Sequence, residues 1–146
     1  MRLALILVLA IGVPAGAFAQ DAAPDLIGTW VGAGKSVVFG QNKFHPGSET
    51  PASPPRIREL EYTMEIKGQD GRLFWGEAWS SASPEVRDTL ALALTADGKT
   101  IVGADNDGAH YMTLVSPDRI ERCYAHPGTS PSGSIVAACG FYERVK

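Results

Sequence analysis

Features that define several protein classes are missing from this 146-residue sequence. After the first 20 residues, no apolar run approaches the length that crosses a bilayer, so we expect no membrane insertion. Basic residues form no stripe, and 13 Lys and Arg against 16 Asp and Glu leave a net charge of −3. Because nucleic acids select basic surfaces, this composition excludes nucleic acid as a favoured partner.

Catalytic motifs are missing as well. The chain has no Gly-x-Ser-x-Gly, no His-Glu-x-x-His and no glycine-rich phosphate-binding motif. Single candidates such as Ser36, Glu77 and His110 stand apart from any partner in the sequence. A site for catalysis needs a nucleophile with a base, or paired carboxylates, in a defined setting. We therefore expect a protein that is not an enzyme and that uses no cofactor.

The N-terminus has the pattern of a secretory signal. Arg2 precedes an apolar run at 3–13, and Ala17-Phe18-Ala19 forms a small-x-small cleavage site. We predict that residues 1–19 are a signal peptide and that residues 20–146 form one domain. The mature protein would then be periplasmic or secreted.

Cysteine is scarce, since Cys123 and Cys139 are the only two. In an exported protein, two cysteines usually form a disulfide bond. We expect one disulfide between them.

No segment of the chain has the hydrophobic periodicity of an α-helix over a useful length. The sequence is instead a series of strand patterns separated by turn residues. The expected strands are 27–39, 58–67, 72–80, 86–95, 99–104, 110–115, 119–125 and 134–145. Turn signals such as Asp70-Gly71 and Asp97-Gly98 join neighbours as hairpins. About eight antiparallel strands in an up-and-down order favour a closed barrel, because closure removes exposed strand edges. A β-sandwich with an ordinary core Trp30 is the alternative.

Two features resemble the calycin superfamily, which includes the lipocalins and avidins. Gly28-Thr29-Trp30 matches the Gly-x-Trp that opens the first strand in both families, and Arg144 matches the Arg that packs over this Trp from the last strand. The resemblance implies an all-β, calycin-like barrel closed at one end by Trp30. Ser36 matches a biotin-binding Ser of avidins, but Gly32 replaces their Asn. We interpret the chain as an outlying member whose ligand is not biotin.

Alternation along the strands assigns the inner face. If Trp30 points inward, so does Ser36; if Arg144 points inward, Cys139 points outward. The preceding strand then has Arg122 and Tyr124 inside, with Cys123 outside. The two cysteines share the outer face, as a disulfide between neighbouring strands requires.

A cation such as Arg122 inside an apolar barrel needs a partner. If the odd residues of the strand 73–79 face inward, Trp75 and Trp79 line the interior and Glu77 can pair with Arg122. The opposite arrangement places Phe74, Gly76 and Ala78 inside, and the sequence does not decide between them. Arg122 then either forms a structural ion pair or serves as a polar anchor for a ligand.

The predicted end opposite Trp30 has the long loops, including 40–57 and 126–133, and is the expected ligand entrance. His45, His110 and His126 also fall there and are the candidate ligands of a metal site, but their spacing is not that of a metal motif. We expect turns and no metal.

The leading hypothesis is a barrel that binds a small, partly apolar molecule. The candidate ligand-binding residues are Ser36, Tyr62, Trp75, Glu77, Trp79, Arg122 and Tyr124. The alternative is a protein-interaction or inhibitor module with a solid barrel and functional loops that expose residues such as Phe44. An empty interior of a few hundred cubic ångströms would favour the first hypothesis, and a filled interior would favour the second.

Overall fold

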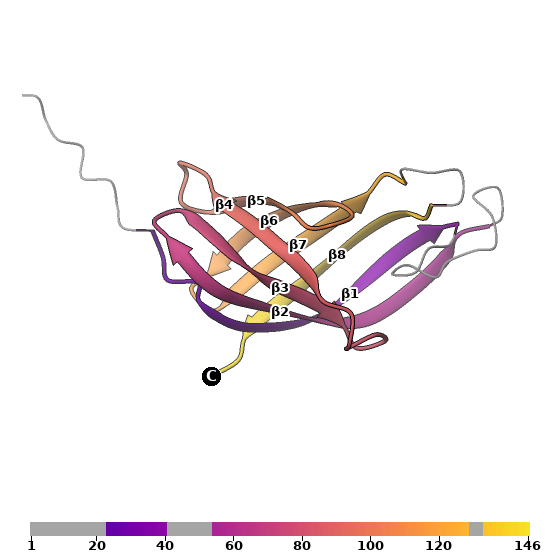
Figure 1. Cartoon of the computed structure of the whole chain (residues 1–146), viewed down its shortest axis with the longest axis horizontal. Helices are drawn as coiled ribbons and strands as arrows, with labels where there is room; N and C mark the ends of the chain where they lie inside the picture. The colour runs from indigo at the N-terminus through magenta and orange to yellow at the C-terminus, as the bar shows by residue number, and fades with distance from the viewer. Residues whose placement is uncertain (1–22, 41–53, 129–132) are drawn as a thin grey trace, which may run out of the picture.

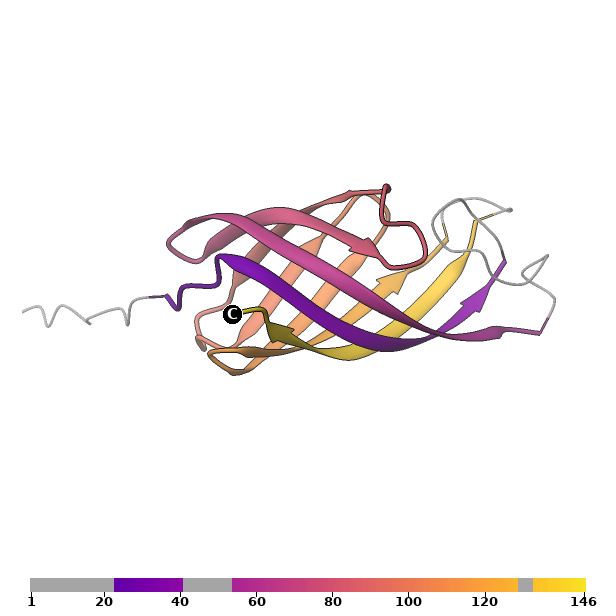
Figure 2. The same ribbon diagram turned by 90° about the horizontal axis from the view of Figure 1, so that it is seen from below.

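The polypeptide forms a closed ring of eight antiparallel strands (Figures 1 and 2). The computed structural model describes residues 23–40, 54–128 and 133–146. The strands are β1 (Gly28–Phe39), β2 (Arg56–Asp70), β3 (Leu73–Ser80), β4 (Asp88–Leu94), β5 (Thr100–Ala104), β6 (Ala109–Ser116), β7 (Arg119–His126) and β8 (Ile135–Arg144). Each strand pairs with the next, and β8 pairs with β1. The predicted all-β, eight-stranded up-and-down barrel is confirmed.

The described residues form no helix. Accordingly, none of the described segments is a helix long and apolar enough to cross a membrane. The predicted signal peptide at 1–19 lies outside the described residues.

Trp30 closes one end of the barrel. It is fully buried, and its indole Nε1–H donates to the carbonyl of Leu26 at 3.0 Å. Trp30 and Arg144 are paired positions on β1 and β8, and the guanidinium carbon of Arg144 lies 4.7 Å from the centre of the indole ring. This is the arrangement that the calycin resemblance implies.

The half of the barrel next to Trp30 is filled by apolar side chains. Inward positions along each strand alternate with exposed ones, as a barrel interior requires. The buried cluster consists of Leu26, Trp30, Met64, Ile66, Phe74, Ala78, Leu90, Leu92, Leu94, Ile101, Met112, Ile120 and Tyr142. We call this half the floor.

Short turns join strands at the floor end, and longer connections join them at the opposite end (Figure 1). The β4–β5 turn is organised by Asp97, whose Oδ1 accepts from the backbone amides of Lys99 and Thr100, both at 2.8 Å. Hydrogen bonds from Thr100 and Thr95 hold the pKa of Asp97 far below its ordinary value. The Asp-Gly signals of the sequence therefore correspond to tight floor turns, and the open end is left to the long loops.

The predicted disulfide is confirmed. Cys123 on β7 and Cys139 on β8 are directly paired, with Cα atoms 4.1 Å apart, and their sulfurs are bonded. Both side chains lie on the outer face, because the neighbouring Arg122 and Tyr124 are among the residues that line the interior pocket.

Removing the disulfide should destabilise the fold. We expect the double variant Cys123→Ser/Cys139→Ser to lose about 2–4 kcal/mol in free energy of unfolding, because the unfolded chain regains the freedom of the closed loop. Urea unfolding followed by circular dichroism measures the loss. Ala137→Ser, on the exposed outer face of β8, is the matched control and should change stability by less than about 0.5 kcal/mol. Two reactive thiols in the native wild-type protein would contradict the prediction.

Candidate functional site

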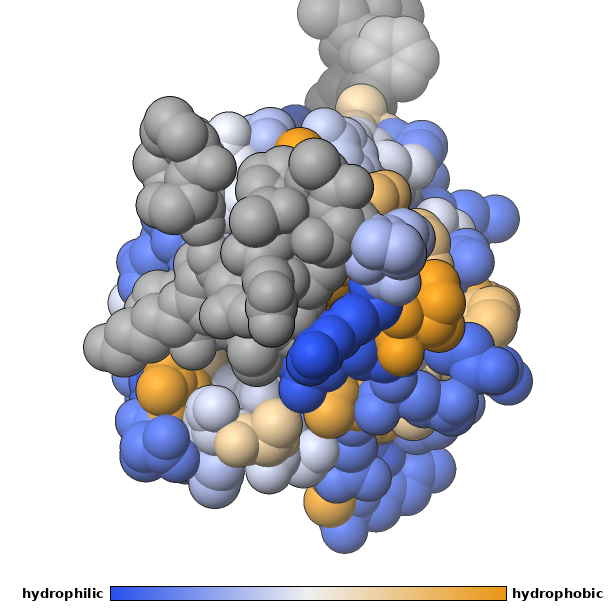
Figure 3. Space-filling model, turned by 90° about the vertical axis from the view of Figure 1, so that its right-hand side faces the viewer, coloured by the Kyte–Doolittle hydropathy of each residue, from blue (hydrophilic) through white to orange (hydrophobic). Residues whose placement is uncertain are grey.

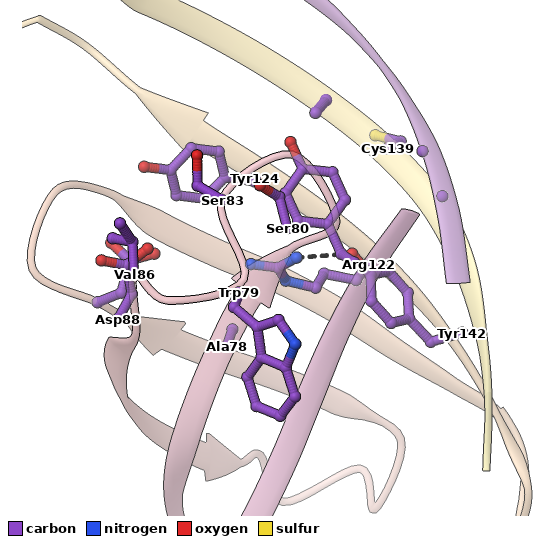
Figure 4. Close-up of a pocket in the computed structure, with 15 residues that line it drawn as sticks. Ala78, Trp79, Ser80, Ser83, Val86, Asp88, Arg122, Tyr124, Cys139 and Tyr142 are labelled. Carbon is purple, nitrogen blue, oxygen red and sulfur yellow. Dashed lines mark hydrogen bonds between the residues drawn. The ribbon is translucent and has the colours of Figure 1, made fainter. Parts of the chain in front are cut away.

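A pocket opens above the floor, at the end of the barrel with the long loops (Figure 4). Its cavity has a volume of about 60 Å³, and the free space is about 710 Å³ when the gaps in its walls and the open mouth are included. The cavity itself has room for several water molecules, and a larger molecule would extend into the open mouth. The lining is contributed by Gly34, Tyr62, Ala78, Trp79, Ser80, Ser83, Val86, Asp88, Asp105, Arg122, Tyr124, Ala138, Cys139, Gly140 and Tyr142. The barrel is therefore solid at its floor and has a small cavity at its mouth, which is below the few hundred cubic ångströms that the first hypothesis predicts.

Figure 3 views the molecule from the mouth. On the described part of this end, hydrophilic residues predominate, and hydrophobic residues lie between them. The described residues visible at this end are therefore mixed in character.

Arg122 lies at the centre of the pocket and is only 7% exposed. Its Nε–H donates to Nδ1 of His110 at 3.1 Å, and its Nη1 donates to the hydroxyl of Tyr142 at 2.7 Å. Nε2 of the fully buried His110 lies 2.9 Å from Oδ2 of Asp105. Because Nδ1 accepts from a guanidinium, the imidazole proton is on Nε2 and is donated to Asp105. We call Asp105, His110, Arg122 and Tyr142 the polar chain.

Three tyrosine rings surround the guanidinium. The guanidinium carbon lies 5.9, 5.8 and 5.4 Å from the ring centres of Tyr62, Tyr124 and Tyr142. At such distances the negative faces of aromatic rings attract a cation. A buried arginine is therefore stabilised by aromatic rings and hydrogen bonds together, and it keeps a fixed place in the pocket.

The β5–β6 turn positions the acid of the polar chain. Oδ1 of Asp105 accepts from the backbone amides of Asp107 and Gly108 at 2.9 and 2.7 Å, which leaves Oδ2 to face His110. Burial raises the pKa of Asp105, but the hydrogen bonds from His110 and these amides outweigh it and lower the pKa below its ordinary value. Burial and the charge of Arg122 lower the pKa of His110, although Asp105 opposes them. Asp105 is thus an anion and His110 is neutral near pH 7.

Asp88 differs from Asp105 because its Oδ1 atom is buried and has no hydrogen-bond partner among the described residues. Burial raises the pKa of Asp88, the charges of Asp105 and Asp107 raise it further, and Arg122 opposes them. Burial and these three carboxylates also raise the pKa of Tyr124. The mouth of the pocket therefore has a carboxylate with one oxygen that accepts no hydrogen bond from the described residues.

The structure brings some of the predicted ligand-binding residues together and separates others. Tyr62, Trp79, Arg122 and Tyr124 line the pocket. Ser36 is on the inner face and 8% exposed but is not part of the lining.

Trp75 and Glu77 were predicted in the site and are corrected to the outer face of β3. Trp75 is 49% exposed, and Glu77 forms an ion pair with Lys67 at 2.8 Å. The inner positions of β3 are the even ones, because Phe74 packs beside its paired neighbour Leu92 in the floor. Glu77 is therefore not the partner of Arg122. Trp79 still lines the pocket, where β3 ends, with the guanidinium carbon of Arg87 3.4 Å from its ring centre.

Of the three histidines, the structure describes His110 and His126, and both are buried. His110 lies inside the barrel, His126 is buried with Nδ1 2.5 Å from the carbonyl oxygen of Asp107, and His45 lies outside the described residues, as does Phe44. No group of three His, Cys, Asp or Glu side chains in the described ranges could hold a metal ion.

The sequence did not predict that Asp88 and Asp105 line the pocket. It also did not predict that His110 forms hydrogen bonds with Asp105 and Arg122. One signal was available for His110, because it lies two residues before Met112 on a strand whose alternate side chains face inward. The part played by Asp105 was hidden because Asp105-Asn106-Asp107-Gly108 is already explained as a turn.

The outer face carries a row of apolar residues across four strands. Leu73, Ala93, Val102 and Tyr111 are successive paired positions on β3 to β6, and the exposed Trp75 lies beside them on β3. Leu73, Val102 and Tyr111 are 56%, 43% and 58% exposed. We call this set the outer row.

No protein-family model and no curated protein matches the sequence. Among solved structures, the chain is similar to the S-type phycobiliprotein lyase CPES from Guillardia theta, with 14% identity and a TM-score of 0.38 over 83% of this chain and 89% of that one. It is also similar to a protein of the DUF3598 family from Nostoc punctiforme, with 14% identity and a TM-score of 0.41 over 82% of this chain and 48% of that one.

Proposed function

We propose that this chain is an exported, calycin-like barrel that binds one small, partly apolar molecule in the pocket at its mouth. The observation that carries the proposal is the state of Arg122. It is buried and lines the pocket, and the described residues accept hydrogen bonds from its Nε and Nη1 atoms. A guanidinium has five N–H donors, so a molecule in the pocket can accept from those that remain.

The lining supports a partly apolar ligand. Aromatic rings of Tyr62 and Tyr124 provide contact area, and Asp88 and Arg122 provide polar contacts. Small-molecule sites commonly combine apolar walls with a few oriented polar groups.

Binding without catalysis is the better-supported activity. Both ring nitrogens of His110 are engaged, one by Arg122 and the other by Asp105, so this imidazole is not free to act as a base. The hydroxyls of Ser80 and Ser83 line the pocket, but His110 is committed to other partners and does not activate them.

Export is part of the proposal. It is supported by the signal-like N-terminus and by the disulfide between Cys123 and Cys139, since disulfides persist mainly in oxidising compartments.

Native mass spectrometry of protein purified from its own host tests the proposal. We expect one retained small mass per chain, released on unfolding. Ala138→Leu, which fills the pocket, should abolish retention, while Ala137→Leu, on the outer face of the same strand, should preserve it. Absence of any retained mass from the wild-type protein, together with no effect of Ala138→Leu on binding of added small molecules, would overturn the proposal.

A second candidate function is a protein-interaction or inhibitor module, which the outer row favours because contiguous exposed apolar residues often mark interfaces. In the same measurement, this function would appear as a retained macromolecule and an empty pocket.

A further inference from the structure

Asp88 and Arg122 line the same pocket, carry opposite charges and do not touch. Arg122 lowers the pKa of Asp88, which places the two charges within each other's influence. No ion pair or hydrogen bond joins them, and Figure 4 shows them on separate parts of the lining. Because both residues line the pocket and are not paired with each other, a molecule in the pocket can contact both.

Each of the two residues has unused hydrogen-bonding capacity of one kind. Oδ1 of Asp88 is a buried acceptor without a hydrogen-bond partner, and Nη2 of Arg122 makes no hydrogen bond to the described residues. Nε and Nη1 of Arg122 donate to His110 and Tyr142, so the guanidinium has a fixed orientation. A molecule that satisfies both must present a donor and an acceptor together.

The remaining walls limit the rest of the molecule. A ligand ring would occupy the cavity of about 60 Å³ and extend into its open mouth, where the rings of Tyr62 and Tyr124 favour stacking or edge contacts with a planar group. A zwitterion would also offer a donor and an acceptor, but it would lose the hydration of two charges on entry. A neutral planar amide loses much less.

We propose that the pocket selects a cyclic amide or ureide, whose ring N–H donates to Asp88 and whose carbonyl oxygen accepts from Nη2 of Arg122. The inference rests on the proposed function, since it names the ligand class of that same pocket. It accounts for both unused groups with one ligand and without a metal or cofactor.

Two probes of nearly equal size test the donor requirement. In ligand-observed NMR titrations of the wild-type protein, 2-pyridone should bind about tenfold more tightly than N-methyl-2-pyridone, because the methyl group leaves Asp88 without a donor. Benzoate, which is an acceptor only, should bind more weakly than 2-pyridone.

The variant Asp88→Ala should reduce the tenfold preference to near unity. Glu85→Ala is the matched control, because Glu85 is an exposed carboxylate on the connection between β3 and β4, three residues before Asp88, and is not part of the lining. It should keep the preference. Asp88→Ala is expected to remain folded, because Oδ1 of Asp88 forms no hydrogen bond in the fold. The comparison of the two pyridones with the wild-type protein does not depend on any variant.

The outcomes separate this inference from the proposed function. Equal binding of both pyridones, or tighter binding of benzoate, would overturn the cyclic amide while leaving a small-molecule pocket in place. Failure of every probe, combined with no retained mass in the host-purified protein, would overturn both.

Discussion

Replacing Arg122 with Met is expected to lower the free energy of unfolding by about 3–5 kcal/mol at pH 8. The substitution removes the only cation from the polar chain and leaves Asp105 charged in a site where its side chain is 5% exposed. It also removes the donor to Tyr142 and the aromatic contacts of the guanidinium. Removing one member of a buried charged network costs more than the network itself contributes, because the remaining charge is left without its counterion.

The loss should be smaller at pH 5.5 than at pH 8. In the wild-type protein, the pKa of His110 is lowered, so on acidification the unfolded chain takes up a proton near pH 6.5 before the native protein does, and stability falls. In the variant, the charge that lowers this pKa is gone, and Nδ1 of His110 is free to take a proton. The resulting imidazolium would pair with Asp105, so the native variant gains protons and stability as the pH falls.

Urea unfolding at the two pH values measures this difference without adding salt. Arg119→Met is the matched control, because Arg119 forms an exposed ion pair with Glu143 at 3.3 Å and lies over the ring of Phe141 on the outer face. Its loss should be about 1 kcal/mol or less and nearly independent of pH. A loss for Arg122→Met that is equal at both pH values, or greater at pH 5.5, would show that His110 does not respond to Arg122.

Replacing Trp30 with Ala should cost about 3–5 kcal/mol, because it empties the floor of its largest side chain. The carbonyl of Leu26 loses its indole donor, and the guanidinium of Arg144 loses the ring beneath it. Trp75→Ala is the control of identical chemistry, and it should cost about 1 kcal/mol, because Trp75 is half exposed on the outer face.

Thermal and urea unfolding measure both losses. If Trp30→Ala does not fold, Trp30→Phe keeps an aromatic ring and loses the hydrogen bond to Leu26, with an expected cost of about 1–2 kcal/mol. Equal costs at positions 30 and 75 would be inconsistent with the assignment of Trp30 to the floor.

Much of the fold was predictable because one inward residue determines the orientation of its whole strand. Trp30 oriented β1, Arg144 oriented β8, and Cys123 and Cys139 then fell on the outer face, where they are bonded. The hairpin order followed from turn residues such as Asp97-Gly98, whose local hydrogen bonds do not depend on distant strands.

The orientation of β3 was not predictable, because large apolar residues occupy both of its faces. Phe74 and Trp75 are adjacent in sequence, and only the pairing of Phe74 with Leu92 selects the face that enters the floor. The bond between His110 and Arg122 was also missed. Their strands were predicted, but the contact depends on register and side-chain rotamer, which a single sequence does not specify.

Because the apolar floor is separate from the pocket at the mouth, pocket residues can be substituted with little effect on the core. Apart from Ala78 and Tyr142, the residues that line the pocket do not belong to the buried apolar cluster. Substitutions at Trp79, Asp88 and Tyr124 can therefore change the pocket while the core of the barrel stays intact. A laboratory library confined to these positions would start from a stable scaffold.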